Sequence, residues 1–458
     1  MDRRTVRPDH VRAVRASIRG RVIVPGDPDY DAARLVFNGG IDRRPGVIVR
    51  AADADDVARV VTLARETGIE LAVRSGGHSA AGHGTSDGGL VLDLRDMNGV
   101  DVDAAGRTAW AGTGITAAAY SEAAGAHGLA TGFGDTGSVG VGGITLGGGI
   151  GYLVRKYGLT IDDLLAADVV TADGELVRAD PTSHPDLFWA IRGGGGNFGV
   201  ATRFHLRLHA LPSIVGGMLL LPATPETVLG FVEAARAAPD ELSTICNVMP
   251  APPMPFVPAE QHGKLVILAL LAYAGPAEPG ERALAPFRAL AAPIADLLRP
   301  MPYHEIYPPD DPSYRPIAAG RTFFVDTFDR RSADAVFEHL GRSRGAMPVA
   351  HIRALGGAMA TVPDDATAFA HRRRVHMIAT AAIHQRVEDS PAHQAWANAF
   401  AAELRRGEKG TYVNFLTDEG EAGIREAYPG RTLDRLRQVK ARYDPANLFR
   451  SNHNIPPA

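Results

Sequence analysis

The stretch of residues 131–151 constrains the fold more than any other part of the chain. Ten of its 21 residues are glycine, and neither a helical nor a strand periodicity runs through it. Ordering a glycine costs more backbone entropy than ordering any other residue. Close approach of the backbone to a ligand explains such a cost, because glycine places no side chain in the way. The sequence therefore predicts an ordered ligand-binding loop at 131–151.

A second glycine-rich turn, Arg74-Ser75-Gly76-Gly77-His78-Ser79, follows the apolar residues 71–73. Residues 46–50 predict a strand before it, and residues 53–67 predict a helix with one apolar face. Together they form a βαβ unit that ends at this turn, and ligands commonly bind at the carboxyl ends of such strands. Composition alone favours a surface turn that exposes His78, so the ligand-binding interpretation depends on the other motifs.

The rest of the chain predicts an α+β protein of three segments. Further strands are expected at 21–24, 89–94, 161–170, 175–178, 200–208, 265–273, 323–325 and 376–383, and further helices at 9–18, 29–37, 116–127 and 186–191. The character of the sequence changes at Pro212, where proline-rich and alanine-rich helices begin to alternate with strands. A helix and an extended tail close the chain from residue 434. We place the segments at 1–212, 213–410 and 411–458.

Composition excludes several classes of protein. A formal net charge of −4 argues against an extended nucleic-acid surface, and no stretch approaches the roughly 20 apolar residues of a membrane helix. The single cysteine, Cys246, excludes an internal disulfide and a multi-thiolate metal site. No secretory or twin-arginine pattern follows the arginine-rich N-terminus. We expect a cytoplasmic protein with no membrane and no nucleic-acid partner.

Two other motifs do not support the kinds of site that their residues first suggest. Gly194, Gly196 and Gly199 match G-x-G-x-x-G, but a helical segment precedes them and a strand follows, the reverse of the dinucleotide-binding order. His371 and His376 stand in a segment with three arginines and lack a complete ligand set, so we expect no metal. The remaining candidate features are the glycine loops, which could hold a cofactor, and tyrosines and histidines, which could transfer protons.

The motifs together resemble one family. They are Arg74–Ser79, Asp87–Leu94, Val139–Gly143 with Leu146–Gly149, Arg155–Leu159, Asp186–Ala190, Gly195–Gly199, Tyr412–Phe415 and Tyr443–Phe449. They resemble the FAD-linked oxidases of the vanillyl-alcohol-oxidase, or PCMH-type, superfamily, and the two C-terminal motifs resemble its berberine-bridge-enzyme branch. The pattern is most similar to bacterial members with a single histidyl link, such as 6-hydroxynicotine oxidases and flavin oxygenases of polyketides. The resemblance implies a PCMH-type FAD-binding domain of two α/β subdomains, and a substrate domain with an antiparallel sheet covered by helices.

The resemblance also implies a covalent flavin. In this family the histidine of the R-S-G-G-H turn is bonded to the 8α-methyl carbon of the flavin, which here is His78. Members with a second bond use a cysteine where this chain has Thr136, and Cys246 lies in another segment, so we expect FAD linked through His78 only. The other residues that the resemblance places at the cofactor are Arg74, Ser75, Gly76, Gly77, Ser79, Gly82, His83, Gly137, Ser138, Val139, Gly142, Gly143, Leu146, Gly149, Gly151, Val200, Asn414 and Asn452, together with Thr136.

Four residues are candidates for the proton transfer that accompanies hydride transfer to a flavin. Tyr412 resembles the general base of the family, and Tyr157 follows two cations that favour a phenolate if the chain brings them close to it. His351 stands where related oxygenases carry an acidic residue. His384 shares one face of a predicted strand with His376, and that face is expected to line a cavity floor.

These features predict an FAD-dependent oxidoreductase of secondary metabolism that removes a hydride from a carbon next to oxygen or nitrogen of a small molecule. The resemblance favours O2 as the electron acceptor, with release of H2O2, because Val139 matches a position where small side chains leave room for O2 beside the flavin. A flavin oxygenase or dehydrogenase acting on polyketides or carbohydrates is the alternative within the enzyme class. A flavin-binding protein without turnover is the alternative outside it.

Overall fold

The computed structural model describes residues 5–311, 313–345, 347–417 and 419–458. Its first sheet has the order β1-β2-β4-β3, in which β2, β4 and β3 are parallel and β1 is antiparallel to β2. The strands are β1 (Arg21–Ile23), β2 (Val47–Arg50), β3 (Leu71–Arg74) and β4 (Leu90–Asp93). Helix α3 (Ala54–Thr67) connects β2 to β3, which confirms the predicted βαβ unit. The Asp53 side chain accepts a hydrogen bond from the backbone N–H of Asp56, and Gly68 in the left-handed region ends the helix.

A second, antiparallel sheet lies beside the first. Its order is β5-β6-β10-β8-β9, and its strands are β5 (Val100–Asp103), β6 (Thr108–Gly112), β8 (Leu164–Val170), β9 (Leu176–Ala179) and β10 (Val200–Arg207). Tyr120 of α4 (Ala117–Gly125), Phe133 and Phe204 are fully buried in the core beneath it. Other elements of this part are α1 (Pro8–Ser17), α2 (Tyr30–Arg34), α6 (Val154–Tyr157), α7 (Pro185–Ala190), β7 (Leu129–Ala130) and β11 (His209–Ala210).

The glycine-rich stretch is not a loop throughout, and the prediction is wrong at its centre. Helix α5 (Val141–Gly147) forms there and ends at Gly148, whose φ is +134°. Val141 and Thr145 are fully buried, and the N–H of Gly142 donates to the carbonyl of Thr113. Tertiary packing therefore overrides the low helix propensity of glycine.

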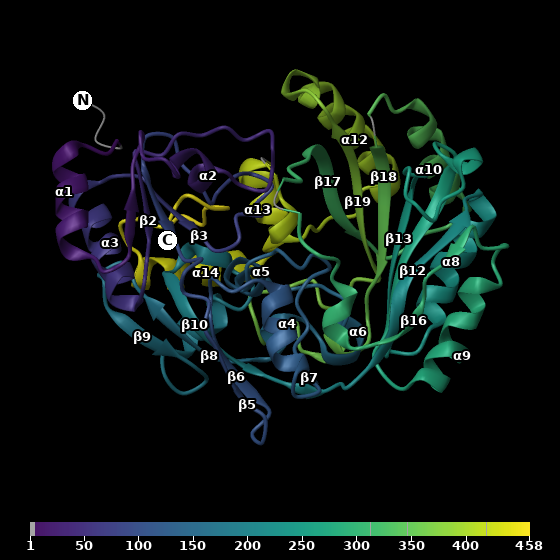
Figure 1. The fold of residues 1–458 in the computed structure, drawn as a ribbon, viewed down its shortest axis with the longest axis horizontal. Helices are drawn as coiled ribbons and strands as arrows, with labels where there is room; N and C mark the ends of the chain where they lie inside the picture. Colours follow the sequence, from purple (N-terminus) through teal and green to yellow (C-terminus); the bar gives the residue numbers. More distant parts are fainter. Residues whose placement is uncertain (1–4, 312, 346, 418) are drawn as a thin grey trace.

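A third sheet of eight strands forms the other half of the molecule (Figure 1). Its order is β15-β12-β14-β13-β18-β19-β17, with β16 also paired to β12, and every pairing is antiparallel. The strands are β12 (Ile214–Pro222), β13 (Leu242–Pro250), β14 (Leu265–Tyr273), β15 (Ala295–Asp296), β16 (Arg299–Met301), β17 (Ile317–Val325), β18 (Met347–Ala354) and β19 (His376–His384).

Helices cover one face of this sheet and leave the other face toward the first half of the molecule (Figure 1). The covering helices are α8 (Pro225–Ala237), α9 (Ala277–Arg288), α10 (Arg330–Arg342) and α12 (Ser390–Arg405), and a short α11 (Ala358–Thr361) contacts α6. Phe231, Phe287 and Phe400 from these helices share a core with Ile352 and Ile378 of the sheet. No helix of the described residues is long and apolar enough to span a bilayer.

The C-terminal segment returns to the first half (Figure 1). Helices α13 (Gly420–Ala427) and α14 (Arg431–Tyr443) precede an extended tail, and α14 packs on α7. Lys440 of α14 is completely buried and donates to the Asp444 carboxylate and to the carbonyls of Asn197 and Phe449. This network ties the tail to the loop before β10, close to the site described next.

Candidate cofactor and substrate site

A cavity of about 390 Å³ lies where the first two sheets, α5 and the C-terminal tail meet. This volume falls in the range of ligand pockets. The turn after β3, the glycine-rich stretch, the glycine loop 194–199 and the residues 412–415 and 449–453 supply its walls. The two glycine-rich segments that the sequence singled out therefore both line this cavity. Their backbones touch, because a Cβ added to Gly140 would stand 2.2 Å from the nitrogen of Gly76.

His78 lies on the cavity wall at the tip of the turn. The Phe37 ring stacks on its imidazole with 4.3 Å between ring centroids. Burial lowers the pKa of His78 to about 4, although the charge of Asp310 and the backbone of Ser138 act in the other direction. The imidazole is therefore neutral at pH 7, and a nitrogen electron pair is free for a bond to a ligand.

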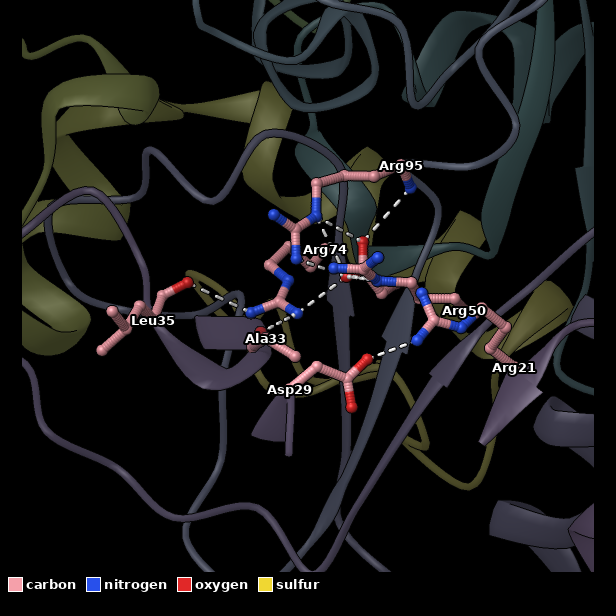
Figure 2. Close-up of polar contacts among 8 residues, drawn as sticks. Arg21, Asp29, Ala33, Leu35, Arg50, Arg74 and Arg95 are labelled. Atoms are coloured by element: carbon pink, nitrogen blue, oxygen red, sulfur yellow. Dashed lines mark hydrogen bonds and ion pairs between the residues drawn. The ribbon is translucent and has the colours of Figure 1, made fainter. Parts of the chain in front are cut away.

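Arg74 packs against the turn, and its guanidinium is held by buried acceptors (Figure 2). Its guanidinium donates to the Asp93 carboxylate (2.8 Å) and to the carbonyl of Ala33 (2.6 Å), and its stem would lie 3.4 Å from a Cβ on Gly77. Asp93 also accepts hydrogen bonds from Arg95, and its side chain has no exposed surface. Although Arg74 lines the cavity, its charge is turned into the protein and paired there.

Tyr412 enters the cavity from the C-terminal segment. Its hydroxyl oxygen accepts hydrogen bonds from the backbone N–H of Gly149 and from the side-chain amide of Asn414, both at 2.8 Å. Burial raises the pKa of Tyr412 to about 12, while these donors and the charge of Arg353 oppose the shift. Both lone pairs of the hydroxyl are used by N–H donors, so its remaining hydrogen-bonding capacity is its own proton.

A buried polar chain leads from the cavity into the third sheet. Arg353 of β18 pairs with Asp135, which lines the cavity, and donates to the carbonyl of Ile150 (2.8 Å). The ring of His351 lies 3.5 Å from the Arg353 guanidinium and 2.9 Å from the side-chain oxygen of Asn247. Burial and the charge of Arg353 lower the pKa of His351 to about 4, so it is a neutral partner behind the cavity wall.

Most of the predicted cofactor residues line this cavity, and five do not. Those that line it are Arg74, Ser75, Gly76, Gly77, His78, Ser79, His83, Thr136, Val139, Gly142, Gly143, Leu146, Val200, Asn414 and Asn452. Gly82, Gly137, Ser138, Gly149 and Gly151 are not among the residues that line it. A Cβ on Gly151 would stand 2.1 Å from the Phe133 carbonyl, and one on Gly149 would stand 1.9 Å from the Thr160 hydroxyl, so close packing of the chain requires these two glycines.

Of the four predicted catalytic residues, Tyr412 lines the cavity, His351 lies behind it next to Arg353, and the other two lie elsewhere. Tyr157 stacks on His209 with 3.9 Å between ring centroids and does not line the cavity. His384 lies under α12, where its ring contacts the Ser390 hydroxyl at 2.7 Å and the ring of His393. The predicted cavity face of β19 is therefore wrong, because that face packs against the covering helices.

Sequence reasoning missed Phe37, Asp135, the glycines 194–196, and Arg353 behind the wall. One signal was present for Asp135, since it is the only charged residue in the stretch 131–151. The sequence carries no comparable signal for Phe37 or Arg353. Their contacts with His78 and Asp135 join segments that are distant along the chain.

The cavity suits a flat, polar cofactor such as FAD. Gly143 and Gly196 line it, and no heavy atom lies within 4 Å of the place where a Cβ on either would stand, so a ligand can approach the backbone there. The buried side-chain oxygen of Asn452, on the same wall, has no hydrogen-bond partner within the described chain. No group of three or more metal-ligating side chains occurs among the residues that the structure describes.

Known proteins match the chain over nearly its full length. A profile of the FAD binding domain matches residues 45–180, and a profile of berberine and berberine-like proteins matches residues 411–456. The (R)-6-hydroxynicotine oxidase of Paenarthrobacter nicotinovorans is 31% identical over 452 residues, which are 96% of this chain and 97% of that protein. The crystal structure of 6-hydroxy-D-nicotine oxidase from Arthrobacter nicotinovorans has a TM-score of 0.85 at 29% identity and covers 96% of this chain and 99% of its own. Chitooligosaccharide oxidase shares the fold, with a TM-score of 0.83 at 21% identity over 98% of this chain and 100% of its own.

The fold, the cavity and these matches define an FAD-dependent oxidoreductase. The chain belongs to the berberine-bridge-enzyme-like FAD-linked oxidases of the PCMH-type superfamily. The family, the α+β fold of the PCMH type and the enzyme class that the sequence predicted are confirmed.

Proposed function

We propose that the chain binds FAD covalently through His78 alone. The neutral imidazole on the cavity wall supports this proposal, since an unprotonated nitrogen is the form that bonds to an electrophilic carbon. Thr136 lines the cavity where doubly linked members of the family carry a cysteine. Cys246 is buried in the core between the third sheet and its helices. On this proposal residues 1–212 and 411–458 hold the cofactor, and residues 213–410 hold the substrate.

Tyr412 is the proposed general base. When bound, FAD supplies the acceptor for a hydride from a substrate carbon next to oxygen or nitrogen. Tyr412 then takes the proton of the substrate O–H or N–H, which requires its phenolate form. The two N–H donors at its oxygen and the charge of Arg353 stabilise that form against burial.

The proposed reaction is the oxidation of a small amine or alcohol, with O2 as the electron acceptor and H2O2 as the second product. The small side chain of Val139 on the cavity wall supports access of O2. The relative that oxidises 6-hydroxynicotine, similar over nearly the whole chain, supports a small substrate. The observation that carries the proposal is the presence of His78 and Tyr412 on the walls of one cavity.

Acid precipitation of the purified protein tests the flavin link. We expect yellow colour and flavin fluorescence to stay with the denatured wild-type protein, and a His78→Ala variant to release its flavin into the supernatant. His83→Ala is the matched control, because His83 also lines the cavity and burial lowers its pKa to about 3. Release of flavin from wild type, or retention by His78→Ala, contradicts the single link.

Peroxide measurement tests the electron acceptor. We expect stoichiometric O2 consumption and H2O2 release with 6-hydroxynicotine or with another small amine or alcohol found by screening. Turnover with a dye but not with O2 would favour a dehydrogenase, and oxygen incorporated into the product would favour an oxygenase. No reduction of the flavin by any amine, alcohol, polyketide or carbohydrate would favour a binding protein.

A further inference from the structure

The cavity wall carries one carboxylate, and its surroundings point to the charge of the substrate. Asp135 is the only Asp or Glu among the cavity-lining residues of the described chain. Three other ionisable groups on the wall leave this carboxylate without a neighbouring free cation: burial lowers the pKa of His78 to about 4 and of His83 to about 3, and Arg74 pairs with Asp93. None of these three groups places an unpaired positive charge on the wall beside Asp135.

The partner of Asp135 lies behind it rather than beside it. The Arg353 side chain is 2% exposed, whereas the Asp135 side chain is 23% exposed. One oxygen of the carboxylate pairs with Arg353, and the other has a long contact of 3.3 Å with the adjacent Thr136 hydroxyl. The pair thus presents its negative end to the cavity, with an oxygen that accepts a further hydrogen bond.

This carboxylate stands at the catalytic end of the cavity. Arg353 donates to the carbonyl of Ile150, and the neighbouring Gly149 donates its N–H to Tyr412. The charge of Arg353 acts on both Asp135 and Tyr412. The proposed base and the Asp135–Arg353 pair are therefore attached to adjacent backbone positions.

We propose that Asp135 determines specificity: its carboxylate, held by Arg353, accepts a hydrogen bond from a protonated amine, so that the site selects cationic over anionic substrates. The Asp135 carboxylate is nearer to the cavity than Arg353, so it attracts a substrate ammonium group and repels a substrate carboxylate. Both effects favour the cationic substrate. This inference rests on the proposed flavin site, since it assigns the substrate class of that site.

Titration of the flavin-containing protein at pH 7 with three ligands of the same ring tests the proposal. Benzylamine is the cation, benzyl alcohol is neutral and benzoate is the anion, and perturbation of the flavin absorption spectrum gives each Kd. For wild type we expect benzylamine to bind at least about tenfold more tightly than benzoate, with benzyl alcohol between them. For Asp135→Asn we expect the order to reverse, because the charge of Arg353 is then uncompensated.

Two further variants keep the test decisive. Asp135→Asn combined with Arg353→Met removes both charges, and we expect the three Kd values to converge. Asp162→Asn is the matched control, because Asp162 pairs with the buried Arg372 outside the cavity, and we expect it to keep the wild-type order.

Three results overturn the inference: tighter binding of benzoate than of benzylamine by wild type, an unchanged order in Asp135→Asn and in the double variant, or no spectral change with any ligand. Wild-type protein without flavin would overturn the proposed function and this inference together. An unchanged ligand order in protein that retains its flavin after acid precipitation would overturn the inference alone.

Discussion

Replacement of Asp93 by asparagine tests how the flavin-binding turn is supported. The Asp93 carboxylate is fully buried and has three arginines around it: it accepts from Arg74 and Arg95 at 2.8 Å, and the Arg50 side chain lies 3.5 Å away (Figure 2). Asp93→Asn keeps the shape and removes the charge. We expect the variant to have a lower free energy of unfolding and a less ordered turn around His78.

The size of the effect follows from burial. Breaking a buried ion pair by removing one partner costs about 3–5 kcal/mol. An unfolding entropy of about 2.1 cal/mol/K per residue gives about 1 kcal/mol/K for cooperative unfolding of the whole chain, so we expect Tm to fall by about 3–5 °C. Because Arg74 packs under the turn, we also expect the variant to contain less flavin per protein than wild type.

Thermal unfolding followed by tryptophan fluorescence, with flavin content measured on the same samples, is the assay. Glu226→Gln is the control, since its pair with Arg330 is exposed to solvent and contributes little to stability. A Tm loss for Asp93→Asn no larger than that of the control would refute the reasoning.

The pH dependence gives a second check. The arginines hold the pKa of Asp93 below its usual range, although burial opposes them. A depressed carboxyl pKa stabilises the fold above the pKa of the unfolded state, about 3.9, and this stabilisation is lost as the pH falls through the folded-state pKa. The Tm difference between wild type and Asp93→Asn should be full at pH 5–7 and shrink only below about pH 4.

Three further predictions concern the candidate catalytic residues. Tyr412→Phe should slow anaerobic reduction of the flavin by substrate by about 10²–10⁴-fold, and an unchanged rate in stopped-flow measurements would exclude Tyr412 as the base. Because the pKa of Tyr412 is raised to about 12, the wild-type reduction rate should rise with pH through the neutral and alkaline range; a rate that falls from pH 7 to 9 would contradict a phenolate base. His384→Ala should leave the reduction rate within twofold of wild type. It should destabilise the fold by about 1–3 kcal/mol, because the change leaves a cavity under α12 and removes the partner of Ser390. A large loss of rate with normal stability would place His384 in the site after all.

Local patterns in the sequence predicted the strands that build the cavity. The βαβ unit around 46–74 has a clear apolar face on its helix and a turn at each end, and these signals need no information from the rest of the chain. The helix at Val141–Gly147 has no such signal, because its stability comes from burial of Val141 and Thr145 against other elements. Propensity alone therefore predicted a loop.

The period of a strand does not say which of its faces meets the cavity. In β19 the face of His376, Thr380 and His384 carries polar side chains and was predicted to face the site. That face also carries Ile378 and Ala382, and the opposite face, with Met377 and Ala379, is wholly apolar, so both faces can be buried and the pattern does not say what covers each. Which face of β19 is turned away from the cavity depends on where the covering helices pack. These helices come from residues 225–405, so the outcome depends on tertiary packing.

Gly149 and Ile150 are the residues at which distant segments of the chain meet. The N–H of Gly149 holds the Tyr412 hydroxyl across 263 residues of sequence, and the carbonyl of Ile150 holds Arg353 across 203. A Cβ added to Gly149 would stand 1.9 Å from the Thr160 hydroxyl, so a larger residue at this position would displace the segment. Because these two adjacent residues hold both side chains, such a displacement would move Tyr412 and Arg353 together, and with Arg353 its partner Asp135.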